Sequence, residues 1–183
     1  HHPLYPERKV VDGVSMYVRK GEVVGISGLM GAGRTELAMS LFGRSYGTGI
    51  SGTLKLSGKE VTLKNEREAI KSGLAYVTED RKGNGLILSN PIRVNTTLAN
   101  LDALCVRGVI DHDKEYAVSD EYREKLHTKC TGIEQNVGNL SGGEKNLLQL
   151  AKLAAGDANL LLLDEPSSHL DTFAQIALEN AIA

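Results

Sequence analysis

The chain has 183 residues, which is enough for one domain with a substantial hydrophobic core. Its hydrophobic content of 41% and charged content of 24% are ordinary for a globular protein, and no stretch approaches the length of a membrane-spanning helix. A net charge of −2 and an aromatic content of 4%, with no Trp, argue against a basic or base-stacking nucleic-acid surface. Cys105 and Cys130 lack metal-ligand spacing, and we interpret them as reduced thiols of a cytosolic protein.

The first predicted elements are strands that lead into a glycine-rich turn. Apolar residues alternate loosely over 10–18, as in a half-buried strand, and residues 23–27 form an apolar, β-branched run. Residues 28–35 then read Gly-Leu-Met-Gly-Ala-Gly-Arg-Thr, and residues 36–42 have a helical character that ends at Gly43. Strand, glycine-rich turn and helix in this order are the context of a phosphate-binding loop.

A phosphate-binding loop works because its glycines let backbone N–H groups converge on an anion, while the helix N-terminus adds partial positive charge. The pattern G-x-x-x-x-G-K-[ST] is met here except at one position, where Arg34 stands in place of lysine. A guanidinium is longer, planar and always charged, so Arg34 need not occupy the place of a lysine ammonium between phosphates. The alternative interpretation is a glycine-rich turn without a ligand.

The next segments predict a hairpin and a short helix. Residues 51–56 and 59–63 are expected to pair across a two-residue turn. Asn65 is suited to cap a helix over 65–72, which would end at Gly73. Together with the elements before them, these segments predict an α/β domain.

A helical region follows a buried strand. The strand is expected over 74–77 and continues into a charged loop over 78–85. Residues 95–104 and 114–126 read as helices with no strand pattern between them. We therefore place a small helical subdomain at 91–132.

The final third contains a capped helix and a strand that is followed by two acids. Ser141 and Glu144 have the spacing of a capping box at the start of a helix. Leu160–Leu163 read as a strand buried on both faces, and Asp164 and Glu165 follow it directly. The two acids are therefore expected at the carboxyl end of the strand, where open α/β sheets place ligands.

The glycine loop, the sequence Leu-Ser-Gly-Gly-Glu at 140–144 and the leucine strand with its two acids together resemble the nucleotide-binding domain of ABC ATPases. The resemblance covers nearly the whole chain. It implies an α/β P-loop NTPase fold of the ABC type, with a mixed sheet, an antiparallel β subdomain and a small helical subdomain. It also implies a single partial nucleotide-binding domain over 1–183, with an ATP-binding core at 1–90 and 133–183.

The same resemblance implies ATP and Mg²⁺ as ligands, ATP hydrolysis as the activity, and roles for single residues. Glu165 is expected to polarise the attacking water as the catalytic residue, with a plain surface acid as the alternative. Residues 141–143 are expected to meet ATP held by a second ABC domain, with a structural helix cap as the alternative. Residues expected to contact nucleotide are Tyr5, Gly28, Gly31, Ala32, Gly33, Arg34, Thr35, Ser141, Gly142 and Gly143. Residues expected to contact the metal are Thr35, Asp164 and Glu79.

The chain departs from the family in two places. Glu79 and Asp80 stand where the family has a glutamine that senses Mg²⁺ and contacts the transporter partner, and an ionised carboxylate cannot donate a hydrogen bond. By contrast, residues 168–171, which include His169, match the position of the family's dimer-contact loop. No residue after Asp171 matches the family's histidine that contacts the γ-phosphate, so we expect a C-terminally truncated domain that is weakly active in isolation.

Different parts of the chain resemble different ABC proteins. Residues 28–37 and 76–82 are similar to the second nucleotide-binding domain of bacterial importers of the ribose, galactose and xylose type, in which an arginine in the glycine loop is usual. Residues 144–153 and 164–171 look more like F-type ABC proteins, which act on ribosomes. A divergent member, a recombinant and a chimera all fit this mixture.

The leading hypothesis is an ATP-binding and ATP-hydrolysing domain that powers carbohydrate import. Its expected partners are membrane permease subunits and a second ABC nucleotide-binding domain, and its expected location is the cytoplasmic face of the membrane. One alternative is an F-type ABC ATPase that acts on the ribosome, and only that alternative implies nucleic acid as a partner. The other is a regulatory module that binds ATP with little hydrolysis.

Overall fold

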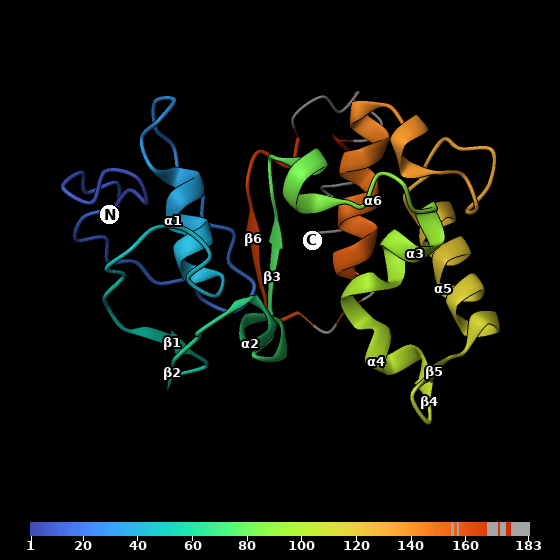
Figure 1. Cartoon of the computed structure of the whole chain (residues 1–183), viewed down its shortest axis with the longest axis horizontal. Coiled ribbons are helices and arrows are strands. Elements are labelled where there is room, and N and C mark those ends of the chain that lie inside the picture. The colour runs from blue at the N-terminus through green and yellow to red at the C-terminus, as the bar shows by residue number, and fades with distance from the viewer. Residues whose placement is uncertain (155, 157, 168–171, 173–174, 177–183) are drawn as a thin grey trace. The chain divides into compact units, whose positions relative to one another are not determined.

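The computed structural model describes residues 1–154, 156, 158–167, 172 and 175–176. It consists of two compact units, His1–Leu74 and Ala75–Ala183. Figure 1 labels the helices and strands of both units. Within the described residues, no helix is long and apolar enough to span a bilayer.

The first unit contains two helices and one β-hairpin. Its elements are α1 (Arg34–Leu41), β1 (Leu54–Leu56), β2 (Lys59–Val61) and α2 (Glu66–Lys71). The two strands pair in antiparallel fashion, with Leu54 opposite Val61. Ser57 and Gly58 connect them with φ values of 49° and 77°, and positive φ at both positions gives a hairpin turn whose twist matches the strands. The predicted hairpin is therefore confirmed.

Helix α2 begins and ends as the sequence indicates. The Asn65 side chain accepts a hydrogen bond from the Glu68 N–H at 3.0 Å, which is the N-cap arrangement. Gly73 follows the helix with φ of 85°, a left-handed conformation that glycine adopts without steric cost.

The two strands expected before the glycine loop are absent. Residues 10–27, all of which the structure describes, contain no strand. From Val14 onward their apolar side chains are exposed, with Val23 at 79% and Ile26 at 50%, whereas Val10 and Val11 are half-buried. An apolar run becomes a buried strand only where neighbouring strands complete its hydrogen bonds and cover its faces, and the described pairing of this unit is that of β1 with β2.

The second unit combines short strands with a group of helices. Its strands are β3 (Leu74–Val77), which begins at the unit boundary, β4 (Cys105–Val106), β5 (Val109–Ile110) and β6 (Leu160–Leu163). Its α-helices are α3 (Ile92–Thr97), α4 (Leu101–Leu104), α5 (His112–Lys125) and α6 (Gly142–Ala154). Shorter turns are η1 (Arg81–Gly85), η2 (Leu98–Asn100) and η3 (Val137–Asn139).

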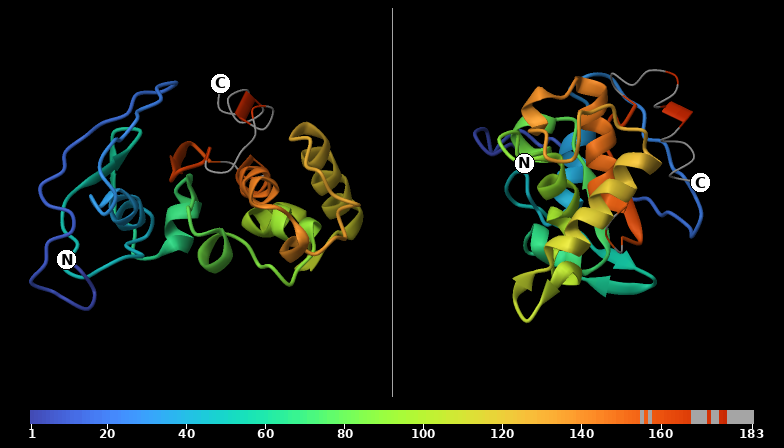
Figure 2. Two further views of the ribbon diagram at one scale, coloured as in Figure 1. Left: turned by 90° about the horizontal axis from the view of Figure 1, so that it is seen from above. Right: turned by 90° about the vertical axis from the view of Figure 1, so that its right-hand side faces the viewer.

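Helices α3, α5 and α6 contact one another and surround the core of this unit (Figures 1 and 2). Ile92 of α3, Val137 of η3 and Leu148 of α6 are each at most 1% exposed. Val77 of β3, at 2% exposed, belongs to the same cluster, so the strand is fixed against the helices by apolar packing.

Three expectations for the second unit need correction. The helix expected over 95–104 is divided into α3, η2 and α4. The hairpin of β4 and β5 then precedes α5, although no strand was expected there. Each of these strands has only two residues, too few for an alternating pattern to be recognised. Finally, Leu161 is 42% exposed, so β6 is not buried on both faces.

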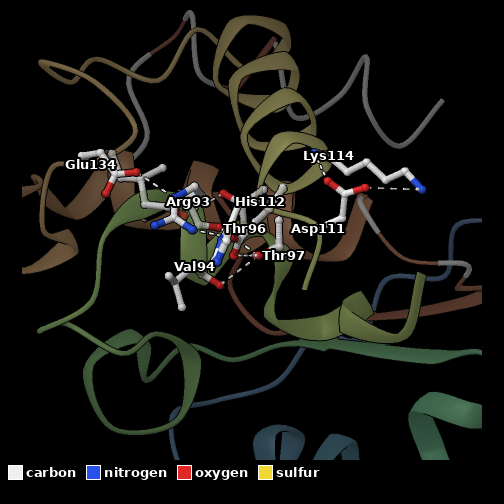
Figure 3. A network of polar contacts seen from close by, with 10 residues as sticks. Arg93, Val94, Thr96, Thr97, Asp111, His112, Lys114 and Glu134 are labelled. Atoms are coloured by element: carbon white, nitrogen blue, oxygen red, sulfur yellow. Dashed lines mark hydrogen bonds and ion pairs between the residues drawn. The ribbon is translucent and has the colours of Figure 1, made fainter. Parts of the chain in front are cut away.

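A buried ion pair joins α3 to α5 (Figure 3). The Glu115 carboxylate, on a side chain 3% exposed, accepts hydrogen bonds from Arg93 Nη1 and from the Thr97 hydroxyl, the latter at 3.1 Å. His112 Nδ1 lies 3.3 Å from the same carboxylate. Arg93 also donates from Nε to Glu134 at 2.7 Å. The guanidinium thus compensates a charge that would otherwise be buried alone.

We expect Arg93→Met to destabilise the second unit by about 3 kcal/mol, because it leaves the Glu115 carboxylate buried without its cationic partner. Native-state hydrogen exchange measures this effect. The amides of α3 and α5 should exchange roughly a hundredfold faster in the variant than in the natural protein. Arg123→Met is the matched control, since Arg123 contacts Asp120 at 2.7 Å and Glu124 at 3.3 Å, whose side chains are 52% and 70% exposed. That exposed network should contribute less than about 1 kcal/mol. Equal effects of the two substitutions would contradict the role of burial.

Candidate functional site

The glycine loop turns sharply into α1. The Ala32 N–H donates to the Leu29 carbonyl at 3.0 Å, and Gly33 precedes the helix with φ of 88°. A Cβ at Gly33 would lie 2.7 Å from the Val10 carbonyl oxygen, closer than side-chain carbons approach in proteins. Both the conformation and the close approach therefore require glycine at this position.

The glycine loop lies at the start of a helix, and most of it is exposed, whereas Gly33 is buried. Gly28, Gly31 and Ala32 are exposed, whereas Arg34 and Thr35 are half-buried in the first turn of α1. The first N–H groups of an α-helix have no acceptor within the helix, and the helix dipole makes this end partly positive. The arrangement is thus suited to bind an anion such as phosphate.

Tyr5 lies in the same unit, in a segment without regular structure. Its side chain is 57% exposed, and its ring lies 5.2 Å from the ring of His2 at an interplanar angle of 41°. Stacking of Tyr5 on an adenine stays a prediction.

In the second unit, the pairing of β3 with β6 determines the position of Asp164. The Asp164 N–H donates to the Val77 carbonyl at 2.9 Å, which extends the contact of the two strands by one residue. The Tyr76 hydroxyl donates to Asp164 Oδ2 at 3.1 Å. The carboxylate is therefore fixed through both its main chain and its side chain at the end of β6.

The Tyr76 hydroxyl lies in a negatively charged environment. Burial is the main cause that raises the pKa of Tyr76 far above its usual value, and the charges of Asp164 and Glu79 raise it further. Tyr76 therefore remains protonated and acts as a donor.

Glu165 follows Asp164 and is exposed. Its φ of 48° places it in the left-handed region, which costs a residue with a side chain roughly 1–2 kcal/mol. The chain therefore changes direction at Glu165, immediately before Pro166.

The predicted capping box at the start of α6 is confirmed. The Ser141 N–H donates to Glu144 Oε2 at 2.7 Å, and the Glu144 N–H donates to the Ser141 hydroxyl at 3.3 Å. Lys145 is 8% exposed and donates from Nζ to the carbonyls of Gly138, at 3.2 Å, and Leu140. Ser141 and Gly142 are exposed and Gly143 is half-buried, so the first turn is accessible from outside the unit.

Arg81, which no sequence motif marked as a site residue, connects the loop after β3 to this helix. Its Nη1 donates to Asn146 Oδ1 at 2.9 Å and lies 3.3 Å from the Gly142 carbonyl, which also accepts from it. One turn of helix separates these two acceptors, so they lie on the same face of α6. At the other end of η1, Lys152 Nζ donates to the Gly85 carbonyl at 3.3 Å. An arginine in a loop of charged residues and glycines was the available signal, but its partner is 65 residues away.

The predicted site residues therefore fall into two groups. The glycine loop and Tyr5 lie in the first unit, while Glu79, the residues 141–143 and the two acids lie in the second. Residues 168–171, expected at a dimer contact, are outside the described part of the chain. The described residues include no cluster of three or more His, Cys, Asp or Glu side chains that could hold a metal ion. A single well-oriented carboxylate such as Asp164 nevertheless fits Mg²⁺, which proteins bind through one or two carboxylates together with water and substrate phosphates.

Solved structures define the class of fold. The dimeric post-hydrolysis state of the ATP-binding cassette MJ0796, bound to ADP and Pi, matches with a TM-score of 0.77 and 16% identity over 94% of this chain and 73% of that chain. A nucleotide-free cassette from an ABC transporter matches with a TM-score of 0.73 and 20% identity over 96% of this chain and 71% of that one. The fold is that of an ATP-binding cassette, as the sequence predicts.

The chain belongs to the ABC transporter family, because the family model described as "ABC transporter" matches residues 11–168. It is 45% identical over 182 residues to an L-arabinose transport ATP-binding protein of Geobacillus stearothermophilus, covering 100% of this chain and 36% of that protein. It is 41% identical over 162 residues to a ribose import ATP-binding protein of Bacillus subtilis, covering 88% of this chain and 32% of that protein. The chain thus spans about a third of the length of these curated relatives.

We expect Arg81→Ala to loosen the first turn of α6. The substitution removes hydrogen bonds from a charged donor, which contribute about 1.5–3 kcal/mol each. Hydrogen exchange of the amides at the start of α6 should accelerate by roughly tenfold or more. Lys82→Ala is the control, because Lys82 is exposed in the same turn and should change exchange little. Unchanged exchange in Arg81→Ala would show that the contact does not hold the helix.

Proposed function

We propose that this chain is an ATP-binding and ATP-hydrolysing part of a carbohydrate importer. The observation that carries the proposal is the 45% identity to an L-arabinose transport ATP-binding protein along the whole of this chain. That match includes the residues after Ser141, the part of the chain that also resembles F-type ABC proteins. It therefore favours sugar import over an action on the ribosome for the whole chain. A xylose import ATP-binding protein of Thermoanaerobacter pseudethanolicus, 39% identical over 96% of this chain and 34% of that protein, supports the same class of substrate.

The geometry within each unit supports the binding of a triphosphate. Backbone N–H groups from Gly31 to Thr35 would donate hydrogen bonds to the phosphates at the start of α1, where the helix dipole favours negative charge. Arg34 adds a permanent positive charge to this loop. The domain organisation that we propose is an ATP-binding core at 1–90 and 133–183 with a helical subdomain at 91–132.

The second group of residues supports hydrolysis. Asp164 and the Thr35 hydroxyl would hold Mg²⁺, whose contribution is to neutralise charge on the phosphate oxygens. Glu165 would accept a hydrogen bond from the attacking water and orient it. Glu79 would act through water at the same centre. The exposed first turn of α6 would contact ATP bound by a second ABC domain, which completes the site.

In the proposed assembly, this second domain and the membrane permease subunits are the partners. The chain would lie at the cytoplasmic face of the membrane through its contact with the permease. Purification of the natural full-length protein tests this directly: we expect permease subunits to copurify with it. Copurification with ribosomes and without a permease would contradict the proposal and support the F-type alternative.

We expect Glu165→Gln in the full-length protein to abolish ATP hydrolysis at this site while ATP still binds, because the amide keeps the shape of the side chain and loses its negative charge. Steady-state hydrolysis and nucleotide binding measure the two properties separately. Glu121→Gln is the matched control, since Glu121 is exposed on α5 and pairs with Lys125 at 2.6 Å. Equal loss of ATP binding and of hydrolysis in Glu165→Gln would contradict a catalytic role.

Arg34 supports a second candidate function, that of a regulatory module that binds ATP with little hydrolysis. A guanidinium cannot place its charge as a compact ammonium does. Comparison of Arg34→Lys with the natural protein tests this candidate. Turnover on the order of several per second at the natural site, lost in Glu165→Gln, would contradict the regulatory candidate.

A further inference from the structure

Tyr76 is a polar residue within an otherwise apolar strand. In β3 it lies between Ala75 and Val77, which are 6% and 2% exposed, and it is itself half-buried. A tyrosine hydroxyl in such a setting usually has a hydrogen-bond partner. Here it donates to Asp164 Oδ2 at 3.1 Å, across 88 residues of sequence.

We propose that Tyr76 is a positioning residue, whose hydroxyl holds the Asp164 carboxylate in the orientation that binds Mg²⁺. This inference rests on the proposed function, because it requires Asp164 to be a metal ligand. It adds to that function a residue that touches neither nucleotide nor metal.

The physical reason lies in the freedom of an aspartate side chain. The hydrogen bond from the Asp164 N–H to the Val77 carbonyl, at 2.9 Å, fixes the main chain. Rotation of the carboxylate about its last bond is nevertheless broad and has no sharp minimum. The Tyr76 hydroxyl removes this freedom by fixing one oxygen.

The hydrogen bond leaves the carboxylate able to bind a cation. A carboxylate has about four lone-pair sites on its two oxygens, and the tyrosine occupies one of them on Oδ2. A hydroxyl is a neutral donor, so it orients Asp164 without the full positive charge that would compete with a metal. Partners of this kind typically change metal affinity by about 10- to 100-fold when they are removed.

A purely structural hydrogen bond would behave differently. It would change the stability of the second unit and leave the metal dependence unchanged. A suitable test therefore needs a measurement of metal affinity and a control that removes a comparable tyrosine hydrogen bond elsewhere. Tyr122 provides this control, because its hydroxyl donates to the Ala154 carbonyl at 2.6 Å within the same unit.

The experiment measures binding of Mn²⁺, used as a paramagnetic probe for Mg²⁺, to the full-length protein with ADP by electron paramagnetic resonance. We expect Tyr76→Phe to weaken Mn²⁺ binding about 10-fold or more, since phenylalanine keeps the ring and loses the donor. ADP affinity in the presence of a chelator should be unchanged, and the shift in Tm should match that of Tyr122→Phe. Tyr122→Phe itself should bind Mn²⁺ like the natural protein.

Asp164→Asn separates failure of this inference from failure of the proposed function. If Asp164→Asn weakens Mn²⁺ binding and Tyr76→Phe does not, Tyr76 has no positioning role and the proposed function stands. If Asp164→Asn also leaves Mn²⁺ binding unchanged, the metal role of Asp164 is wrong and the inference falls with it. Weaker ADP binding by Tyr76→Phe in the presence of a chelator would also overturn the inference, because it would indicate general damage to the domain.

Discussion

The pairing of β3 with β6 is the constraint on which the candidate site of the second unit depends. Val77 anchors β3 in the apolar cluster formed with the helices, and its carbonyl accepts the Asp164 N–H at 2.9 Å. The same register brings the Tyr76 hydroxyl to the Asp164 side chain. A shift of one residue along β3 would turn Tyr76 to the opposite face and would remove the second contact. Hydrophobic packing therefore fixes the position of a carboxylate that takes no part in the core.

Helix α6 links three functions that the sequence presents separately. At its start lie the accessible residues Ser141 and Gly142, its apolar face contributes Leu147 and Leu148 to the core, and a polar face receives the turn η1. The loop after β3 contains Glu79 near its start. Two positions further along the chain, Arg81 contacts α6. The loop and the start of α6 are thus joined by hydrogen bonds from a charged donor. In the proposed importer, that contact would join the segment near the permease to the segment that meets the second nucleotide.

Local structure was predictable from the sequence, whereas contacts between residues far apart in the chain were not. The Asn65 cap, the hairpin of β1 and β2, and the Ser141–Glu144 capping box depend on residues at most a few positions apart, so their patterns are visible in the chain. The recognition of an ABC ATPase also rests on local motifs and is confirmed. The strands expected over 10–18 and 23–27 depend on neighbours that must cover them, and a run of apolar residues does not specify those neighbours. The contacts of Tyr76 and Arg81 join residues 88 and 65 positions apart, and no periodic pattern encodes them.

Glu165 departs from a local structural rule at the end of β6. Its φ of 48° is a conformation that glycine adopts without penalty, and it directly precedes a proline, which restricts its backbone further. Stability alone therefore favours glycine at this position, by roughly 1–2 kcal/mol from the left-handed conformation. The chain instead carries a side chain whose carboxylate is exposed next to Asp164. Residues that violate local rules in this way concentrate at functional sites, where the surrounding structure holds them. The cost of the conformation is understandable if the carboxylate at the end of β6 is needed for chemistry, which is the role that the proposed hydrolysis gives it.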